Sequence, residues 1–136
     1  MLKLIVGIKG TGKTKTLISM ANEAVEKTNG SVVFLEKGTK LIHEIKYQVR
    51  LIDTDEYAIT DAEYLFGFVA GIYASNHDVT DIFIDSALKI CENDMDSFIK
   101  FIDMANTFVE SKSINLVITS SIPVEEVPEA LKKYID

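Results

Sequence analysis

The sequence contains few of the residues that mark several common classes of protein. Its single cysteine, Cys91, excludes an internal disulfide and suits a reducing compartment, so we expect a cytoplasmic protein. No apolar run approaches the roughly 20 residues that a membrane-spanning helix needs, and we expect no signal peptide before the first apolar segment. The two histidines, His43 and His77, lie apart, with no nucleophile or metal-ligand pattern around them.

Composition and charge describe an ordinary globular chain with an uneven charge distribution. Hydrophobic residues make up 47% and charged residues 26% of the 136 positions, and no linker or repeat divides them, so we expect a single nucleotide-binding domain over 1–136. Residues 1–50 hold nine basic and four acidic side chains, whereas residues 51–136 hold five and seventeen. The net charge of −7 argues against a protein that coats nucleic acid.

The basic half begins with a glycine-rich stretch, Gly7 to Thr14, that fits Gly-x-x-x-x-Gly-Lys-[Ser/Thr] at every fixed position. An apolar segment over 2–6 precedes it, and a helical pattern over 15–27 follows it. This strand–loop–helix context is what a phosphate-binding loop requires, because glycine backbones and the free amides of a helix start can surround an anion.

The motif therefore predicts a site for a nucleoside triphosphate with Mg²⁺. The Lys13 ammonium would hold the outer phosphates, and the Thr14 hydroxyl would be a ligand of the metal. The predicted nucleotide-binding residues are Gly7, Ile8, Lys9, Gly10, Thr11, Gly12, Lys13, Thr14 and Lys15.

The rest of the chain alternates between predicted strands and helices. Further strands are expected over 31–35, 49–52, 81–85 and 114–118, with a polar loop over 53–56 after the second of these. Helices are expected over 62–75 with Asp61 as the N-cap, from Asp94 as the cap to about 109, and over 129–134. A mixed pattern over 39–47 could form a short helix with Leu41, Ile42 and Ile45 on one face. Gly67 and Gly71 give the helix over 62–75 a small face, and we expect this helix to pack closely against the sheet, with a dimer interface as the alternative. The predicted fold is α/β, a three-layer αβα sandwich around a mostly parallel five-stranded sheet.

Ligands of such sheets bind at the carboxyl ends of the strands, so the polar residues there are the other site candidates. Asp85 ends an apolar strand and is either a Mg²⁺ ligand or a turn-forming residue. Glu36 is either a carboxylate that orients or deprotonates a water at the γ-phosphate, or a solvated strand end. Thr119 and Ser120 could contact phosphate or water, or form turns, and the only arginine, Arg50, could be an arginine finger or a surface residue.

Taken in order, these motifs resemble the RecA-like branch of P-loop ATPases. In that family the loop helix leads to a strand with the catalytic glutamate, here Glu36, and a later strand ends in Asp-Ser, here Asp85-Ser86. The resemblance implies a Mg²⁺-dependent ATPase in which Lys13 and Glu36 are catalytic and Thr14 and Asp85 hold the metal. It also implies a homo-oligomer or a larger protein partner that completes the site.

The chain departs from this family in three places. Thr119-Ser120-Ser121 stands where a Gln or Asn-Gln pair is usual, and we expect no DNA-contacting segments of the recombinase kind after it. Partitioning ATPases have an additional signature lysine in the phosphate-binding loop, and the corresponding position in this sequence is Ile8. Two other functions therefore stay open: a nucleotide-dependent binding or regulatory module with little hydrolysis, and a small-molecule or nucleotide kinase. Kinases usually close over the acceptor with an arginine-bearing lid. Because this chain has a single arginine, Arg50, the kinase function is disfavoured.

Overall fold

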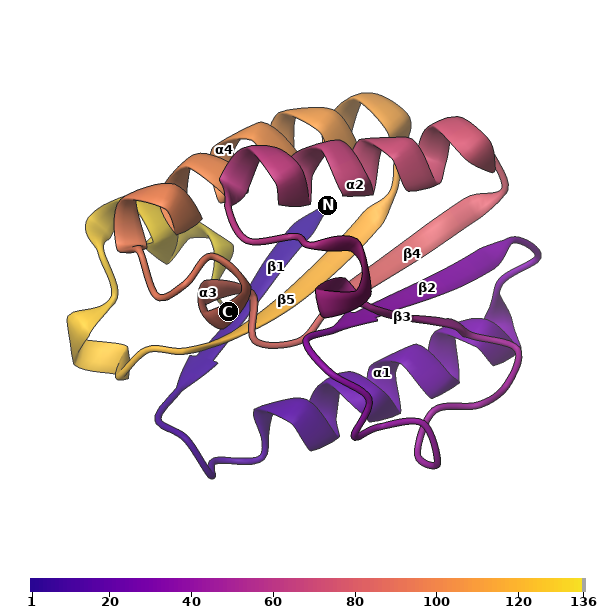
Figure 1. The fold of residues 1–136 in the computed structure, drawn as a ribbon, viewed down its shortest axis with the longest axis horizontal. Helices are drawn as coiled ribbons and strands as arrows, with labels where there is room; N and C mark the ends of the chain where they lie inside the picture. The colour runs from indigo at the N-terminus through magenta and orange to yellow at the C-terminus, as the bar shows by residue number, and fades with distance from the viewer. Residues whose placement is uncertain (136) are drawn as a thin grey trace.

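The computed structural model describes residues 1–135 and contains one five-stranded sheet with helices on both faces (Figure 1). The predicted alternation of strands and helices is confirmed, and most observed boundaries lie within two residues of the expected ones. The elements are β1 (Leu2–Gly7), α1 (Lys13–Lys27), β2 (Ser31–Glu36), β3 (Arg50–Asp53), η1 (Thr54–Tyr57), α2 (Ala62–Ser75), β4 (Val79–Ile84), α3 (Ala87–Ile90), α4 (Met95–Lys112), β5 (Asn115–Ser121), η2 (Val124–Glu126) and η3 (Glu129–Tyr134).

All strand pairs of the sheet are parallel, in the order β1-β5-β4-β2-β3. β4 and β5 lie inside the sheet, which explains their continuous apolar runs at 82–84 and 116–118, buried on both faces. β1 and β3 are the edges. The last strand in sequence, β5, therefore separates the glycine-rich loop after β1 from the end of β4.

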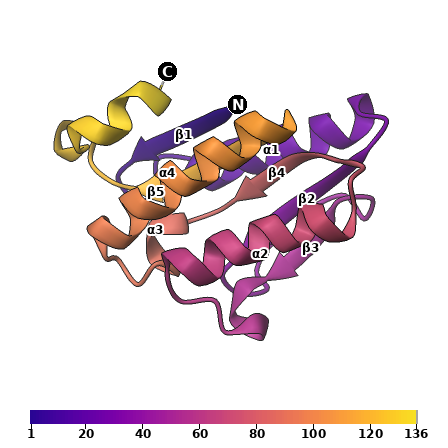
Figure 2. The same ribbon diagram turned by 90° about the horizontal axis from the view of Figure 1, so that it is seen from above.

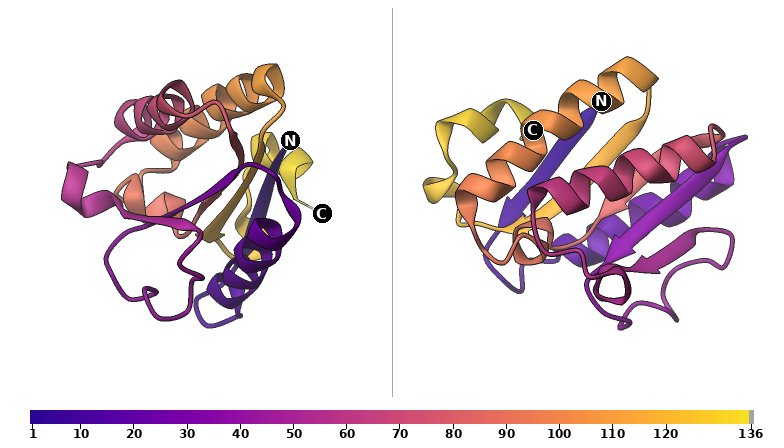
Figure 3. Two further views of the ribbon diagram at one scale, coloured as in Figure 1. Left: turned by 90° about the vertical axis from the view of Figure 1, so that its right-hand side faces the viewer. Right: turned by 45° about the horizontal axis from the view of Figure 1, so that its top comes forward.

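Two hydrophobic cores lie on opposite faces of the sheet, and the strands contribute alternate residues to each. On one face α1 and the chain over 38–49 cover a smaller core that includes Phe34 and Phe83. On the other, α2 and α4 run side by side over the larger core (Figure 2), which η3 closes beside β1. Figure 3 (left) shows the sheet between α1 on one side and α2 with α4 on the other.

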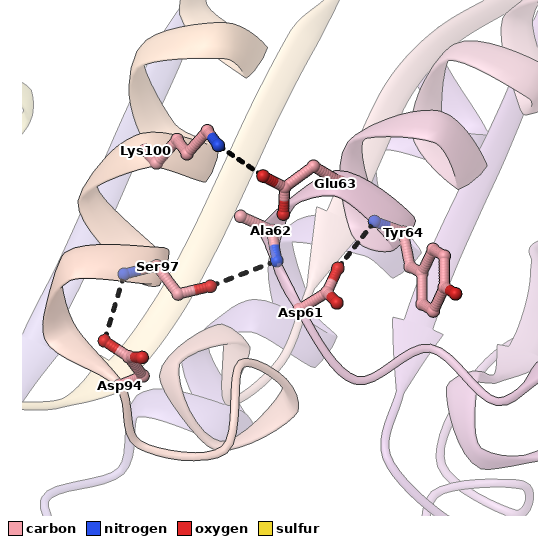
Figure 4. A network of polar contacts seen from close by, with 7 residues as sticks. All are labelled: Asp61, Ala62, Glu63, Tyr64, Asp94, Ser97 and Lys100. Atoms are coloured by element: carbon pink, nitrogen blue, oxygen red, sulfur yellow. Dashed lines mark hydrogen bonds and ion pairs between the residues drawn. The ribbon is translucent and has the colours of Figure 1, made fainter.

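The amino ends of α2 and α4 are capped and joined to each other (Figure 4). The Asp61 carboxylate accepts a hydrogen bond from Tyr64 N at 2.9 Å, and the Asp94 carboxylate accepts one from Ser97 N at 3.2 Å. The Ser97 hydroxyl oxygen accepts a hydrogen bond from the first amide of α2, that of Ala62, at 3.1 Å. An ion pair between Lys100 and Glu63 adds a second link. The two expected aspartate caps are thus confirmed, and they fix the helices against one another.

Of three expectations about local structure, two are wrong. Residues 39–47 form turns rather than a helix, and Ile42 is exposed while Leu41 and Ile45 pack into the α1 core. The expected packing of α2 against the sheet is confirmed through Leu65 and Val69, whereas Gly67 and Gly71 lie on the exposed side of the helix, with nothing within 4 Å of an added Cβ. The 54–57 segment, expected as a loop, is a 3₁₀ turn.

Two boundary differences also matter for the site. β5 continues to Ser121, so that Thr119 and Ser120 lie inside the strand, and the short α3 follows Asp85 directly. Within residues 1–135, no helix is both long and apolar enough to cross a membrane.

Candidate functional site

The loop between β1 and α1 has a backbone that favours glycine and leaves a helix end open. Gly12 has φ +84, and a Cβ on Gly7 would lie 2.8 Å from Thr11 Oγ1. Gly12 is also the residue before α1, so α1 starts without a side-chain cap, and its first turn contains no acid. The first amides of α1 therefore remain available to an anionic ligand, which the positive end of the helix dipole also favours.

Two side chains of the loop donate hydrogen bonds to the same carbonyl. Lys13 Nζ lies 2.9 Å from the Ile8 carbonyl oxygen, and Thr11 Oγ1 lies 2.8 Å from it. The Lys13 ammonium thus folds back over the loop from the first residue of α1. It is held there by one exposed, uncharged acceptor, which an anionic group could replace.

Three polar residues face the side of the sheet that α1 covers, because successive side chains of a strand alternate between the two faces. Phe34, Phe83 and Val117 lie in the α1 core, and the residues two positions further along their strands face the same side. These residues are Glu36, Asp85 and Thr119. They lie next to one another across the sheet, because Leu35 pairs with Ile84 and Ile84 pairs with Ile118.

Asp85 is the meeting point of three elements. Thr14 Oγ1, in the first turn of α1, lies 3.0 and 3.1 Å from the two Asp85 carboxylate oxygens. Thr119 Oγ1, on β5, donates to Asp85 Oδ1 at 2.7 Å and accepts from Ser86 N at 2.8 Å. The hydroxyl of Thr119 therefore orients the Asp85 carboxylate, and Asp85 as a residue is 8% exposed.

Glu36 ends β2 beside Asp85 and is almost completely enclosed, with 4% of its surface exposed. Its carboxylate oxygens accept hydrogen bonds from Lys40 N at 2.8 Å and, more weakly, from Leu41 N at 3.4 Å. Burial raises the pKa of Glu36 above its ordinary value, and the nearby Asp85 and Asp53 carboxylates raise it further, although the two amide hydrogen bonds oppose these effects. Glu36 thus combines a raised pKa with a fixed orientation.

A cavity of about 820 Å³ lies beside the loop, between the chain over 36–44 and the chain over 85–93. This volume is in the range of roughly 300–1,000 Å³ that is typical of small-molecule sites. Six lysines and three carboxylates line the cavity, so that it carries positive charge in a chain whose net charge is −7. The lysines are Lys9, Lys13, Lys15, Lys37, Lys40 and Lys89, and the acids are Glu36, Glu44 and Asp85.

The polar groups at the mouth of the loop fit a magnesium–phosphate ligand in their chemistry. Thr14 and Asp85 offer a hydroxyl and a carboxylate, which are the hard oxygen donors that Mg²⁺ prefers. In the described chain, residues 1–135, no group of three or more His, Cys, Asp or Glu side chains could hold a metal ion. A cation at Thr14 and Asp85 would therefore need further oxygens from a bound phosphate and from water, as Mg²⁺ in phosphate sites commonly does.

The structure does not bring every sequence candidate to this cavity. Arg50 is exposed at the start of β3, three residues before the end of that strand. Ser120 faces the other side of the sheet, where its hydroxyl oxygen accepts a hydrogen bond from Leu88 N at 3.3 Å. Cys91 is buried, and burial raises the pKa of its thiol to about 11, so it is held as an unreactive thiol.

The cavity also contains lysines that the sequence did not single out. Lys40 lies in the turns after β2, and Lys89 lies in α3. Neither belongs to a recognisable motif, and only the way the chain folds around Glu36 and Asp85 brings them to the loop.

The sheet order, the open helix start and the two facing helix layers define a three-layer αβα protein with a P-loop-like fold. A solved structure of PCH-2 from C. elegans resembles the chain with a TM-score of 0.59 and 16% sequence identity. The match covers 99% of this chain but 33% of the PCH-2 chain, so the present chain corresponds to about a third of that protein. At this identity the likeness shows the fold alone. No protein-family model matches the chain, and no curated protein sequence matches it.

Proposed function

We propose that the protein binds a nucleoside triphosphate with Mg²⁺ at residues 7–15 and hydrolyses it, as a RecA-like ATPase. The observation that carries the proposal is the position of Thr14 and Asp85. Their side chains converge within 3.1 Å at the uncapped start of α1, at the mouth of a positively charged cavity.

Each group of the site has a role in this proposal. Gly7, Gly10 and Gly12 shape the loop so that its amides surround the phosphates, and Lys13 leaves the Ile8 carbonyl to hold them. Thr14 and Asp85 would hold Mg²⁺, which neutralises charge on the outer phosphates when it is bound. Thr119 keeps the Asp85 carboxylate turned toward Thr14.

Glu36 is the proposed general base for the attacking water. Its raised pKa makes it a stronger base than an ordinary glutamate, and its place beside Asp85 puts it near the outer phosphates. Arg50 does not line the cavity of its own chain, so an arginine finger at this site would come from a neighbouring subunit or a larger partner.

One observation favours a second candidate function, a nucleotide-dependent binding module with little turnover. Both carboxylate oxygens of Glu36 already accept amide hydrogen bonds from Lys40 and Leu41, and this arrangement would have to loosen before Glu36 could accept a proton from water. A module of this kind would bind the same ligand at the same residues but release it unchanged.

A titration of ATP with and without Mg²⁺, on the wild type and on Lys13→Ala, tests the binding site. We expect Lys13→Ala to weaken Mg–ATP binding by about 100-fold, because it removes a charge-assisted contact to phosphate. Lys27→Ala is the matched control, since Lys27 lies at the far end of α1 and pairs with Glu23. Equal affinity of Lys13→Ala and wild type would exclude the proposed site.

Single-turnover hydrolysis by the wild type and by Glu36→Gln separates the two candidate functions. If Glu36 is the base, the substitution should slow hydrolysis by about 100-fold or more while ATP binding is kept. If both proteins bind ATP and both leave it intact, the chain is a binding module and the ATPase proposal fails.

A further inference from the structure

We propose that Lys40 and Lys89 grip the terminal phosphate from opposite sides of the cavity and make the site selective for triphosphates over diphosphates. This inference rests on the proposed function, because it names the groups that contact one part of the same ligand. Arg50, the only arginine of the chain, does not line the cavity, and the inference assigns the positive charge near the outer phosphates to two lysines instead.

The first observation is the distribution of unpaired lysines. Within residues 1–135 four lysine ammonium groups have no hydrogen-bond, ion-pair or ring partner, although the chain has a large excess of acids. All four, Lys9, Lys15, Lys40 and Lys89, line the cavity.

The lysines outside the cavity behave differently. Lys27, Lys46, Lys100 and Lys132 form ion pairs, and Lys112 and Lys133 lie over tyrosine rings. Among the thirteen lysines of residues 1–135 an unpaired ammonium group is therefore the less common arrangement. Four of them around one cavity indicate that the missing partner is an anionic ligand.

The second observation is that Lys40 and Lys89 occupy equivalent places in the segments that follow two neighbouring strands. Lys40 follows Glu36, the last residue of β2, by four positions, and Lys89 follows Asp85, just beyond β4, by four positions. β2 and β4 are adjacent in the sheet. The two lysines therefore enter the cavity from the two chain segments that leave the sheet beside Asp85, where the outer phosphates of a metal-bound nucleotide would lie.

Polar groups of the site itself hold the backbone of each lysine segment. The Glu36 carboxylate accepts a hydrogen bond from Lys40 N at 2.8 Å, so the proposed base also fixes the residue that carries the ammonium group. On the other side, Thr119 Oγ1 accepts from Ser86 N at 2.8 Å, and Ser120 Oγ accepts from Leu88 N at 3.3 Å. Two adjacent hydroxyls of β5, one on each face of the sheet, thus anchor the segment that carries Lys89.

The remaining cavity lysines are placed to act nearer the loop. Three of them, Lys9, Lys13 and Lys15, belong to the loop or to the first turn of α1. These lysines would contact the phosphates that the loop amides bind. Lys37 forms an ion pair with Asp55 at 2.6 Å. Lys40 and Lys89 are therefore the unpaired cations that a third phosphate, extending beyond the loop, would meet.

The test compares the affinities for Mg–ATP and Mg–ADP in the wild type, Lys40→Met, Lys89→Met and the double variant. Methionine keeps the length of the side chain and removes the charge. We expect the double variant to reduce the preference for ATP over ADP by about tenfold or more while the affinity for ADP changes by less than about threefold. Lys40→Arg and Lys89→Arg should retain the preference, and Lys132→Met, remote from the cavity and paired with Glu129, is the control.

The outcomes separate this inference from the proposed function. Suppose that Lys13→Ala abolishes nucleotide binding but the double methionine variant keeps the wild-type ratio of the ATP and ADP affinities. The proposed role of Lys40 and Lys89 is then wrong, whereas the proposed nucleotide site at residues 7–15 is retained. An equal loss of ATP and ADP affinity in the double variant also overturns the proposed role of Lys40 and Lys89. The two lysines would then attract any nucleotide anion and would not contact the terminal phosphate specifically. If Lys13→Ala binds ATP as the wild type does, the proposed site itself fails.

Discussion

The three long helices of the protein begin in two different ways. The first amides of α2 and α4 are capped by Asp61 and Asp94, and Ser97 connects the two caps (Figure 4). α1 begins after Gly12, which has no side chain, and no acid stands in its first turn. The residues around its start are lysines and hydroxyl groups.

This contrast separates the two helix ends that side chains cap from the one that is open to the proposed ligand. A capping carboxylate satisfies amides that would otherwise lack partners, and it stabilises a helix by about 1 kcal/mol. When no ligand is bound, α1 lacks this stabilisation. The same amides can then stabilise an anion, which also benefits from the positive end of the helix. Substitutions at Gly12, at Glu36 and at the two caps should test the contrast, with effects that decrease in that order.

A negative charge placed at the start of α1 should strongly weaken ligand binding. We expect Gly12→Asp to weaken Mg–ATP binding by about 100-fold or more, because a carboxylate at the loop would repel phosphate. Gly12→Asn is the matched control, since asparagine has the same shape, no charge and a similar tolerance of positive φ. Isothermal titration of both variants measures the effect. Equal binding by the Asp and Asn variants would show that charge at this helix end is unimportant.

Glu36 provides an intermediate case, because its carboxylate also accepts backbone amides but is buried beside two other acids. Its folded-state pKa is raised above the ordinary value of 4.5, so its charged form reduces stability at neutral pH, and this penalty disappears as the pH falls through the raised pKa toward 4.5. Glu36→Gln should therefore raise the melting temperature at pH 7.5 and have little effect below pH 4.5. Hydrolysis by the wild type should decline on acidification at a higher pH than an ordinary glutamate would give.

Thermal unfolding at several pH values, combined with a pH–rate profile, measures both effects of Glu36. Stability and hydrolysis should change in opposite directions in Glu36→Gln. A melting temperature that falls at pH 7.5 would mean that the hydrogen bonds to Lys40 and Leu41 outweigh the burial of charge, and the interpretation of Glu36 as a buried base would be wrong.

Removing the caps of α2 and α4 should change stability but not binding. Asp61→Ala and Asp94→Ala should each destabilise the fold by about 1 kcal/mol, which lowers the melting temperature by a few degrees, while ATP affinity stays within about twofold of wild type. Glu63→Gln, which removes only the exposed ion pair to Lys100, should have no measurable effect. Loss of ATP binding in either cap variant would mean that the two faces of the sheet are coupled.

Local signals in the sequence were sufficient to predict the strands, the long helices and the loop. Asp61 and Asp94 were recognisable as caps because each precedes an apolar helical pattern, and the alternation of apolar strands with helices predicted the parallel sheet. The period of two also explains why Glu36, Asp85 and Thr119 share one face. Their meeting with Thr14 depends on the strand order, which local patterns do not contain.

The errors arise where distant contacts decide the structure. The 39–47 segment has a helical apolar pattern, but Glu36 and the Asn22 side chain bind its backbone amides and carbonyls and hold it in turns. Lys40 and Lys89 gave no signal, because the partners of a lysine depend on the tertiary fold.

The strand order has a consequence for the time at which the site can form during synthesis. Among residues 1–135, the sheet neighbour of β1 is β5, and the two strands pair from Leu2 with Leu116 through Gly7 with Ser121. A nascent chain therefore cannot place the glycine-rich loop against Asp85 until residue 121 has left the ribosome. Because contacts of such long sequence separation form late in folding, ligand capture would act as a test of whether translation of this sheet has been completed.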